Sequence, residues 1–149
     1  MNNTKKTNLL YIIDDDEIIV YLTGKTLRKH DFNSEIKTFC HGLEALENLK
    51  NIPQTGEQWP DIILLDLNMP ELSGIEVARE IIRLRLTCFV VICSVECDPE
   101  LIAAAQLAGV LGYVLKRRLT KDLVLAVKRA ACGEVFISGA EPGRPTILL

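Results

Sequence analysis

Polar residues that could do chemistry together end four separate apolar runs of this chain. Asp66 follows residues 62–65, an apolar block too short for a helix and typical of a strand buried on both faces of a parallel sheet. In open α/β sheets, ligands bind in the crevice beyond the carboxyl ends of the strands. Asp66 is therefore expected where a binding site forms. The polar residues that end the other three runs are Asp14 and Asp15, Ser94, and Lys116.

These residue types point to phosphoryl chemistry. Three carboxylates at one sheet edge repel one another, which either raises a pKa or recruits a divalent cation. Mg2+ fits such a site because it takes oxygen ligands and is commonly held by one or two carboxylates together with a phosphate. A phosphoryl group on Asp66 would meet the Ser94 hydroxyl and the Lys116 ammonium, which supply the alignment and charge neutralisation that phosphoryl transfer needs. Asp66 is the expected nucleophile and would form an acyl phosphate.

The elements that must position these residues alternate along the chain as strand and helix. Five strands alternating with five helices predict a doubly wound α/β fold, a parallel sheet with helices on both faces and right-handed crossovers. The strands are predicted at residues 8–13, 35–39, 62–65, 88–93 and 112–115, and the helices at 17–30, shortly after Gly42, after Gly74, from Pro99 to Gly109, and from a cap at Thr120 to Gly133.

Two local features accompany these predicted elements. Asp16 is expected to cap the first helix. The residues at helical spacing in that helix are Ile18, Tyr21, Leu22, Lys25 and Leu27. Residues 51–60 contain proline and glycine and are expected to form a polar loop that leads into the third strand.

The composition limits the class of protein. A chain of 149 residues that is 48% hydrophobic and 25% charged is typical of one globular domain. Its apolar runs fall short of the ~20 residues of a membrane span, and its polar start lacks a signal-peptide core, which favours a cytoplasmic location. A net charge of −3 does not favour nucleic-acid binding. The five cysteines lack paired zinc-site spacing, so buried reduced thiols are expected, among them Cys88, Cys93 and Cys97.

Four ordered sequence blocks carry a family resemblance. The blocks IIDDDE, LLDLNMPELSG, VVICSVE and GYVLK resemble the receiver domain of two-component response regulators, over about residues 8–132. The spacings of 28 residues from Asp66 to Ser94 and of 22 from Ser94 to Lys116 are also similar to the family. The resemblance implies a flavodoxin-like, chemotaxis-receiver-like fold with strand order 2-1-3-4-5.

The resemblance also implies a phosphorylation site and a metal. Asp66 would be the phosphorylated residue, and Mg2+ would be the cofactor. Asp15 and Asp66 would bind the metal directly, Asp14 would act through water, and the main-chain carbonyl of Asn68 would be the third protein ligand.

Switching and partners follow from the same resemblance. Ser94 would hold a phosphoryl oxygen, Lys116 would pair with the phosphate or with Asp66, and Tyr113 would turn inward when Ser94 moves. The phosphoryl group would come from a sensor histidine kinase or a histidine phosphotransfer protein. The surface of the fourth helix, fifth strand and fifth helix would then control dimerisation or partner binding. Such a protein is not an ordinary enzyme, since it catalyses only its own phosphorylation and dephosphorylation.

Two positions depart from the family pattern. Arg117 stands where a proline often follows the lysine, so the cis peptide bond expected in the family is predicted to be absent. Val95 follows Ser94 where a small residue is frequent. Its branched side chain is expected to narrow access to the phosphoryl group and to slow phosphoryl loss.

Other functions remain open at this point. In a haloacid-dehalogenase-like phosphatase, Asp14 would be the nucleophile and Asp16 the acid, so the discriminating observation is whether Asp14 or Asp66 becomes phosphorylated. A receiver-shaped interaction module that no longer switches is a further alternative. The sequence TGKT at residues 23–26 resembles a phosphate-binding loop, but it lacks the required glycine and falls within a predicted helix.

The end of the chain and its middle carry two further hypotheses. Residues 133–149 are expected to form a C-terminal tail or truncated linker without an output domain, so DNA binding is not expected from this chain alone.

Residues 1–74 contain seven Asn and one Ala, whereas residues 75–149 contain no Asn and nine Ala. We hypothesise that the chain is a chimera whose halves, before and after Gly74, come from different parents.

Overall fold

The computed structural model describes residues 7–30 and 32–139, which form an α/β fold around one parallel sheet. The strand order is β2-β1-β3-β4-β5-β6, so the predicted order 2-1-3-4-5 is confirmed. A short sixth strand, within the residues predicted to be a tail, extends the sheet beyond that prediction. The strands are β1 (Leu9–Ile13), β2 (Glu35–Phe39), β3 (Ile62–Asp66), β4 (Phe89–Ser94), β5 (Gly112–Leu115) and β6 (Phe136–Ile137).

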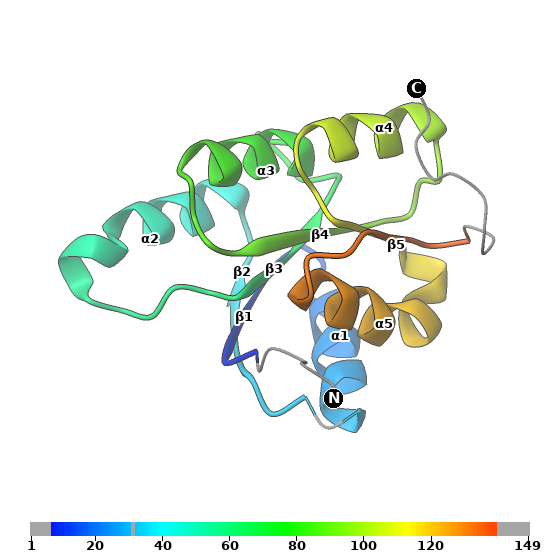
Figure 1. The fold of residues 1–149 in the computed structure, drawn as a ribbon, viewed down its shortest axis with the longest axis horizontal. Helices are drawn as coiled ribbons and strands as arrows, with labels where there is room; N and C mark the ends of the chain where they lie inside the picture. Colours follow the sequence, from blue (N-terminus) through cyan, green and yellow to red (C-terminus); the bar gives the residue numbers. More distant parts are fainter. Residues whose placement is uncertain (1–6, 31, 140–149) are drawn as a thin grey trace.

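Helices cover both faces of the sheet (Figure 1). One face carries α1 and α5, and the other carries α2, α3 and α4. Because successive side chains of a strand point to opposite faces, Leu10 and Ile12 of β1 enter the core under α1 and α5, whereas Tyr11 and Ile13 enter the other core. The helices are α1 (Glu17–Lys29), α2 (Gly42–Thr55), α3 (Gly74–Arg83), α4 (Pro99–Leu107) and α5 (Leu119–Ala131), with a 3-10 helix, η1 (Lys116–Arg118), before α5.

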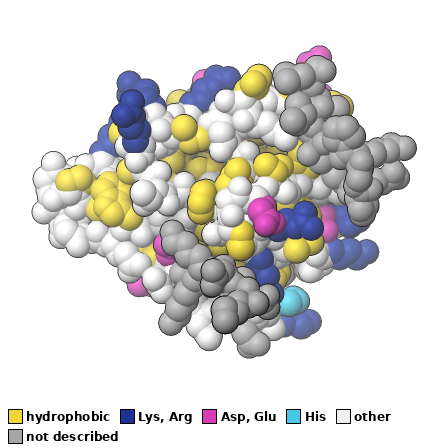
Figure 2. Space-filling view, in the orientation of Figure 1, with side chains coloured by type: hydrophobic (Ala, Val, Ile, Leu, Met, Phe, Trp, Pro, Cys, Tyr) yellow, Lys and Arg dark blue, Asp and Glu magenta, His cyan; other side chains and the backbone are white. Residues whose placement is uncertain are grey.

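On the face shown in Figure 2, Lys and Arg side chains lie in several separate groups among hydrophobic and uncharged ones. Among the described residues, every helix is too short or too polar to span a membrane.

Side chains cap the N-termini of three helices, α1, α3 and α4. The Asp16 carboxylate accepts hydrogen bonds from main-chain N–H groups in the first turn of α1, as predicted. Ser73 and Glu76 form a reciprocal capping box on α3. Asp98 caps α4, and Pro99 occupies its first turn, which confirms the predicted start of that helix.

The expected stripe of α1 matches its buried face only at Leu27, which is buried. Ile18 and Tyr21 are 71% and 66% exposed, whereas Thr23 and Gly24, which are not part of the stripe, are buried. Helix α1 packs against α5, and Leu27 lies in the core that the two helices share. Burial is therefore decided by which side of α1 faces α5, not by hydrophobicity alone.

The polar loop predicted at residues 51–60 is also wrong in its first half. Helix α2 continues to Thr55 and includes Pro53 in its last turns. Burial of Ile52 stabilises this extension, and the helix ends at Gly56, whose φ of 73° gives the left-handed conformation typical of a C-terminal cap.

Three smaller predictions have mixed outcomes. Thr120 does not cap α5, because that helix continues directly from η1 and begins at Leu119. The described chain has no cis peptide bond, so the peptide between Lys116 and Arg117 is trans, as predicted. All five cysteines are free thiols, but only Cys93 is fully buried, and Cys97 is exposed because it lies in the loop after β4.

Gly74 allows α3 to begin directly behind the end of β3. Its N–H donates to the Leu67 carbonyl at 2.8 Å. A Cβ at this position would overlap the Asp66 main-chain carbonyl and lie 2.9 Å from the Leu67 Cα. These neighbours are main-chain atoms and cannot rotate away, so the absent side chain is a requirement of the fold.

We expect Gly74→Ala to destabilise the protein by about 2 kcal/mol or more, because relieving the overlap must move β3 or α3. Urea denaturation would measure the free energy of unfolding. Gly24→Ala is the matched control, since a Cβ there meets only the Arg28 side chain at 3.5 Å and alanine favours the helix. Equal stabilities of the two variants would contradict this account of Gly74.

Candidate functional site

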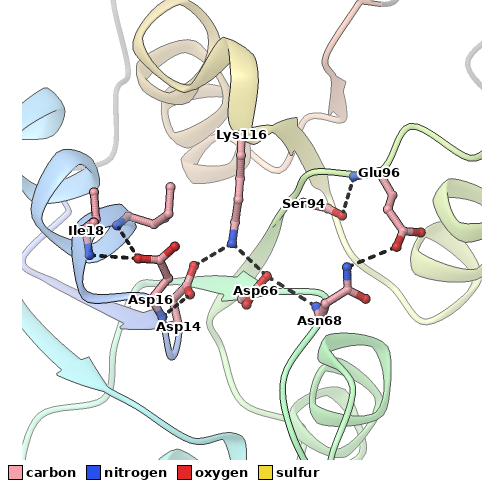
Figure 3. A network of polar contacts seen from close by, with 9 residues as sticks. Asp14, Asp16, Ile18, Asp66, Asn68, Ser94, Glu96 and Lys116 are labelled. Carbon is pink, nitrogen blue, oxygen red and sulfur yellow. Dashed lines mark hydrogen bonds and ion pairs between the residues drawn. The ribbon is translucent and has the colours of Figure 1, made fainter.

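The carboxyl ends of four neighbouring strands bring the predicted site residues together (Figure 3). Asp14 follows β1, Asp66 ends β3, Ser94 ends β4 and Lys116 follows β5. The β3–β4 register pairs Asp66 with Cys93, which places Ser94 one residue further along β4. The convergence expected from the sequence is thus present in the structure.

Lys116 links two buried carboxylates. Its Nζ lies 3.1 Å from Asp14 Oδ2 and 3.0 Å from Asp66 Oδ1. Asp14 and Asp66 are each 4% exposed, so these ion pairs are shielded from bulk water. A charge-assisted hydrogen bond in such surroundings is stronger than one at the surface. The single ammonium therefore holds the ends of β1 and β3 together electrostatically.

The three aspartates differ in how many of their oxygens are engaged. Asp14 uses both, since Oδ1 accepts the Asp16 N–H at 2.9 Å and Oδ2 pairs with Lys116. Asp66 uses Oδ1, which also accepts the Asn68 N–H at 3.3 Å. Within the described residues, Asp66 Oδ2 and the exposed Asp15 carboxylate receive no hydrogen bond or ion pair. These oxygens are free to meet a ligand.

The aspartates also provide a donor set for a cation. One carboxylate oxygen from each of Asp14, Asp15 and Asp66 lies within 4.8 Å of the others. All three are hard oxygen donors at the carboxyl ends of β1 and β3, and Asp15 is exposed to solvent. This chemistry fits Mg2+, which prefers oxygen ligands and keeps part of its water shell.

Crowding shifts the proton affinity of the site. Burial and the nearby Asp14 charge raise the pKa of Asp66 to about 6, although Lys116 and the Asn68 N–H oppose the shift. Burial alone would lower the pKa of Lys116, but its hydrogen bonds to the two carboxylates raise it. Lys116 therefore stays charged, and it only partly compensates the negative charge around Asp66.

The loop after β4 is held by hydrogen bonds between Glu96 and three other residues. The fully buried Ser94 accepts the Glu96 N–H at its Oγ, 3.0 Å away. Tyr113 is also buried, and its hydroxyl donates to the Glu96 carbonyl at 2.7 Å. The Asn68 side chain donates to Glu96 Oε1 at 3.3 Å. Tyr113 thus points inward in this structure.

Glu96 is a site residue that the sequence reasoning missed. It lies in a polar loop where charged side chains are common, and its main-chain carbonyl, not its side chain, contacts Tyr113. The one available signal is its position two residues after Ser94.

Comparisons with known proteins agree with this geometry. The family model of the response regulator receiver domain matches residues 10–128. The nitrate/nitrite response regulator NarL of Escherichia coli is 40% identical over 99 residues, which cover 66% of this chain and 42% of NarL. The transcriptional regulatory protein DegU of Brevibacillus brevis is 35% identical over 138 residues, which cover 92% of this chain and 56% of DegU. This chain therefore spans about half the length of these relatives.

A solved structure has the same fold. The signal receiver domain of a NarL response regulator from Mycobacterium tuberculosis superposes with a TM-score of 0.73 and 25% sequence identity. The match covers 87% of this chain and 100% of that domain.

The raised pKa of Asp66 predicts that ionisation of this carboxyl lowers the free energy of unfolding as the pH rises. A carboxyl whose pKa rises from 3.8 to about 6 on folding stabilises the folded state below pH ~4, and that contribution is lost as the pH rises through 6. Without Mg2+ at pH 8, we expect Asp66→Asn to be more stable than the wild type by on the order of 1–3 kcal/mol. The difference should shrink as the pH falls through 6 and vanish near 4.

Urea denaturation in a chelator from pH 4 to 8 would measure these stabilities. Asp98→Asn is the matched control, because it removes one carboxylate from an exposed helix cap where asparagine caps equally well. A wild type that stays as stable as Asp66→Asn at pH 8 would refute the crowding argument.

Proposed function

This chain belongs to the response regulator receiver domain family, and on that basis we propose that it accepts a phosphoryl group on Asp66. The donor would be a sensor histidine kinase or a histidine phosphotransfer protein. The observation that carries the proposal is the buried cluster in which Lys116 bridges Asp14 and Asp66 while Asp66 Oδ2 stays free.

The proposed reaction is a displacement at phosphorus. A carboxylate oxygen of Asp66, for which Oδ2 is the candidate, attacks the phosphorus of a phosphohistidine. The new P–O bond forms as the P–N bond breaks, and the imidazole leaves with the electron pair and takes up a proton. Such reactions depend mainly on positioning and charge stabilisation, because the protein has little covalent chemistry to do.

The residues proposed to hold Mg2+ are those with free or main-chain oxygens. Asp15, Asp66 and the main-chain carbonyl of Asn68 would bind it directly, whereas Asp14, both of whose oxygens are engaged, would act through water. When bound, the ion would neutralise charge on the transferring phosphoryl oxygens.

Ser94 and Lys116 would stabilise the phosphorylated form. The Ser94 Oγ accepts the Glu96 N–H, and its hydroxyl proton would turn to donate to a phosphoryl oxygen. Lys116 would exchange a carboxylate contact for the phosphoryl group. These added interactions exist only in the active arrangement, so phosphorylation would shift a pre-existing equilibrium between two conformations.

The proposed readout is the surface of α4, β5 and α5, which would control dimerisation or docking of a partner. Tyr113 would move with this change in conformation, because its hydroxyl contacts Glu96, the same residue that Ser94 contacts. On this proposal the protein catalyses only its own phosphorylation and dephosphorylation, and the chain's relatives include transcriptional regulators.

Intact mass tests the proposal most directly. Incubation with acetyl phosphate and Mg2+ should add one phosphoryl group, ~80 Da, to the wild type and none to Asp66→Asn or to protein in a chelator. Peptide mapping should place the group on Asp66. Phosphate on Asp14 would instead favour the phosphatase alternative, and the absence of any adduct would favour a module that does not switch.

Val95 offers a test of phosphoryl lifetime. It is 68% exposed and directly follows the buried Ser94. On this proposal its branched side chain would restrict water at the phosphoryl group. We expect Val95→Ala to shorten the acyl-phosphate lifetime about two- to fivefold, a barrier change of less than ~1 kcal/mol. Val135→Ala, at another exposed valine far along the chain, is the control. Equal lifetimes for Val95→Ala and the wild type would contradict the expectation.

A further inference from the structure

A second polar network lies beside the candidate site, at the C-terminal end of β5. The Ser138 hydroxyl donates to Asp122 Oδ2 at 2.7 Å and accepts the Leu115 N–H at 3.0 Å. Arg118 donates to both oxygens of Asp122, at 2.8 and 3.4 Å. Ser138 and Asp122 are both buried, so these bonds are not exchanged freely with water.

The Ser138 side chain replaces a main-chain partner of the sheet. Strand β6 pairs in parallel with β5, and the Ser138 N–H donates to the Tyr113 carbonyl at 2.8 Å. In a regular parallel ladder, the next N–H of β5, that of Leu115, would donate to the Ser138 carbonyl. Here the Ser138 hydroxyl accepts that bond, and Gly139 follows with a φ of 75°. The last N–H of β5 is therefore paired with a side chain and not with a main-chain carbonyl.

The network contacts residues on both sides of Lys116, through the main-chain N–H of Leu115 and the side chain of Arg118. Leu115 immediately precedes Lys116, and Arg118 ends the 3-10 helix that begins at Lys116. Both are tied to the Asp122–Ser138 pair, which lies on α5 and beyond β6. The start of α5 has no side-chain cap, and the Asp122–Ser138 pair joins this turn to the end of β5.

We propose that Ser138 and Asp122 are positioning residues that set the place of the Lys116 ammonium between Asp14 and Asp66. The proposal rests on the proposed function in giving Lys116 a role in phosphoryl transfer. The Lys116 Nζ meets two acceptors at 3.1 and 3.0 Å, so a small shift of its main chain lengthens at least one contact. A misplacement of ~1 Å can cost about 100-fold in rate.

The test compares three serine variants by their rate of phosphorylation from acetyl phosphate. Ser138→Ala should slow the reaction about tenfold or more, and Ser138→Thr, which keeps the hydroxyl, should restore most of the rate. Ser34→Ala is the matched control, because the Ser34 hydroxyl also makes a partly buried bond, to the Thr7 carbonyl, away from the strand ends that carry the site. Its rate should equal that of the wild type.

A second comparison separates positioning from general destabilisation. In a Lys116→Ala background, Ser138→Ala should cause no further slowing, because the residue that it positions is gone. An equal slowing in both backgrounds would overturn the proposal. Urea denaturation of every variant would show that each is folded under the assay conditions.

A third readout does not depend on phosphorylation. The Lys116 side-chain signals, read by heteronuclear NMR of the unphosphorylated protein, should move in Ser138→Ala and stay in place in Ser34→Ala. If the wild type accepts no phosphoryl group, the proposed function fails, and these signals still decide the positioning proposal. Unmoved Lys116 signals in Ser138→Ala would refute it.

Discussion

The crowding of negative charge at the ends of β1 and β3 is the constraint on which the rest of the site depends. Two buried carboxylates cannot be left without compensation, because an unpaired buried charge is costly. Lys116 compensates both through ion pairs near 3 Å, but the pKa of Asp66 still rises to about 6. One ammonium thus compensates the carboxylates only in part, and such a site favours ligands that bring positive charge.

The parallel sheet makes this crowding possible, and the sequence predicts it well. Four apolar runs end on polar residues, and parallel strands bring those ends to one edge. Asp66, Ser94 and Lys116 could therefore be placed from residue types and order alone. A slip of one residue in any strand would turn its side chains to the opposite face, so the continuous apolar core also fixes the site.

The features that sequence reasoning missed depend on how elements are oriented and on main-chain contacts. The side of α1 that faces α5 carries Thr23 and Gly24, whereas the more hydrophobic Tyr21 is exposed. Glu96 contributes through its carbonyl, which carries no residue-specific signal. Ser138 follows a strand of only two residues, too short for a periodic pattern.

Strand β6 has a consequence for how the domain behaves in isolation. β5 is buried along its whole length, and β6 covers one of its edges through bonds to the Leu111 and Tyr113 carbonyls. The opposite edge strand, β2, instead carries polar residues such as Glu35 and Lys37. A domain boundary at residue 132 remains a prediction, but a chain cut there would lose β6 and expose an apolar edge able to pair with another copy. Two residues of strand thus keep the edge of β5 paired within the domain.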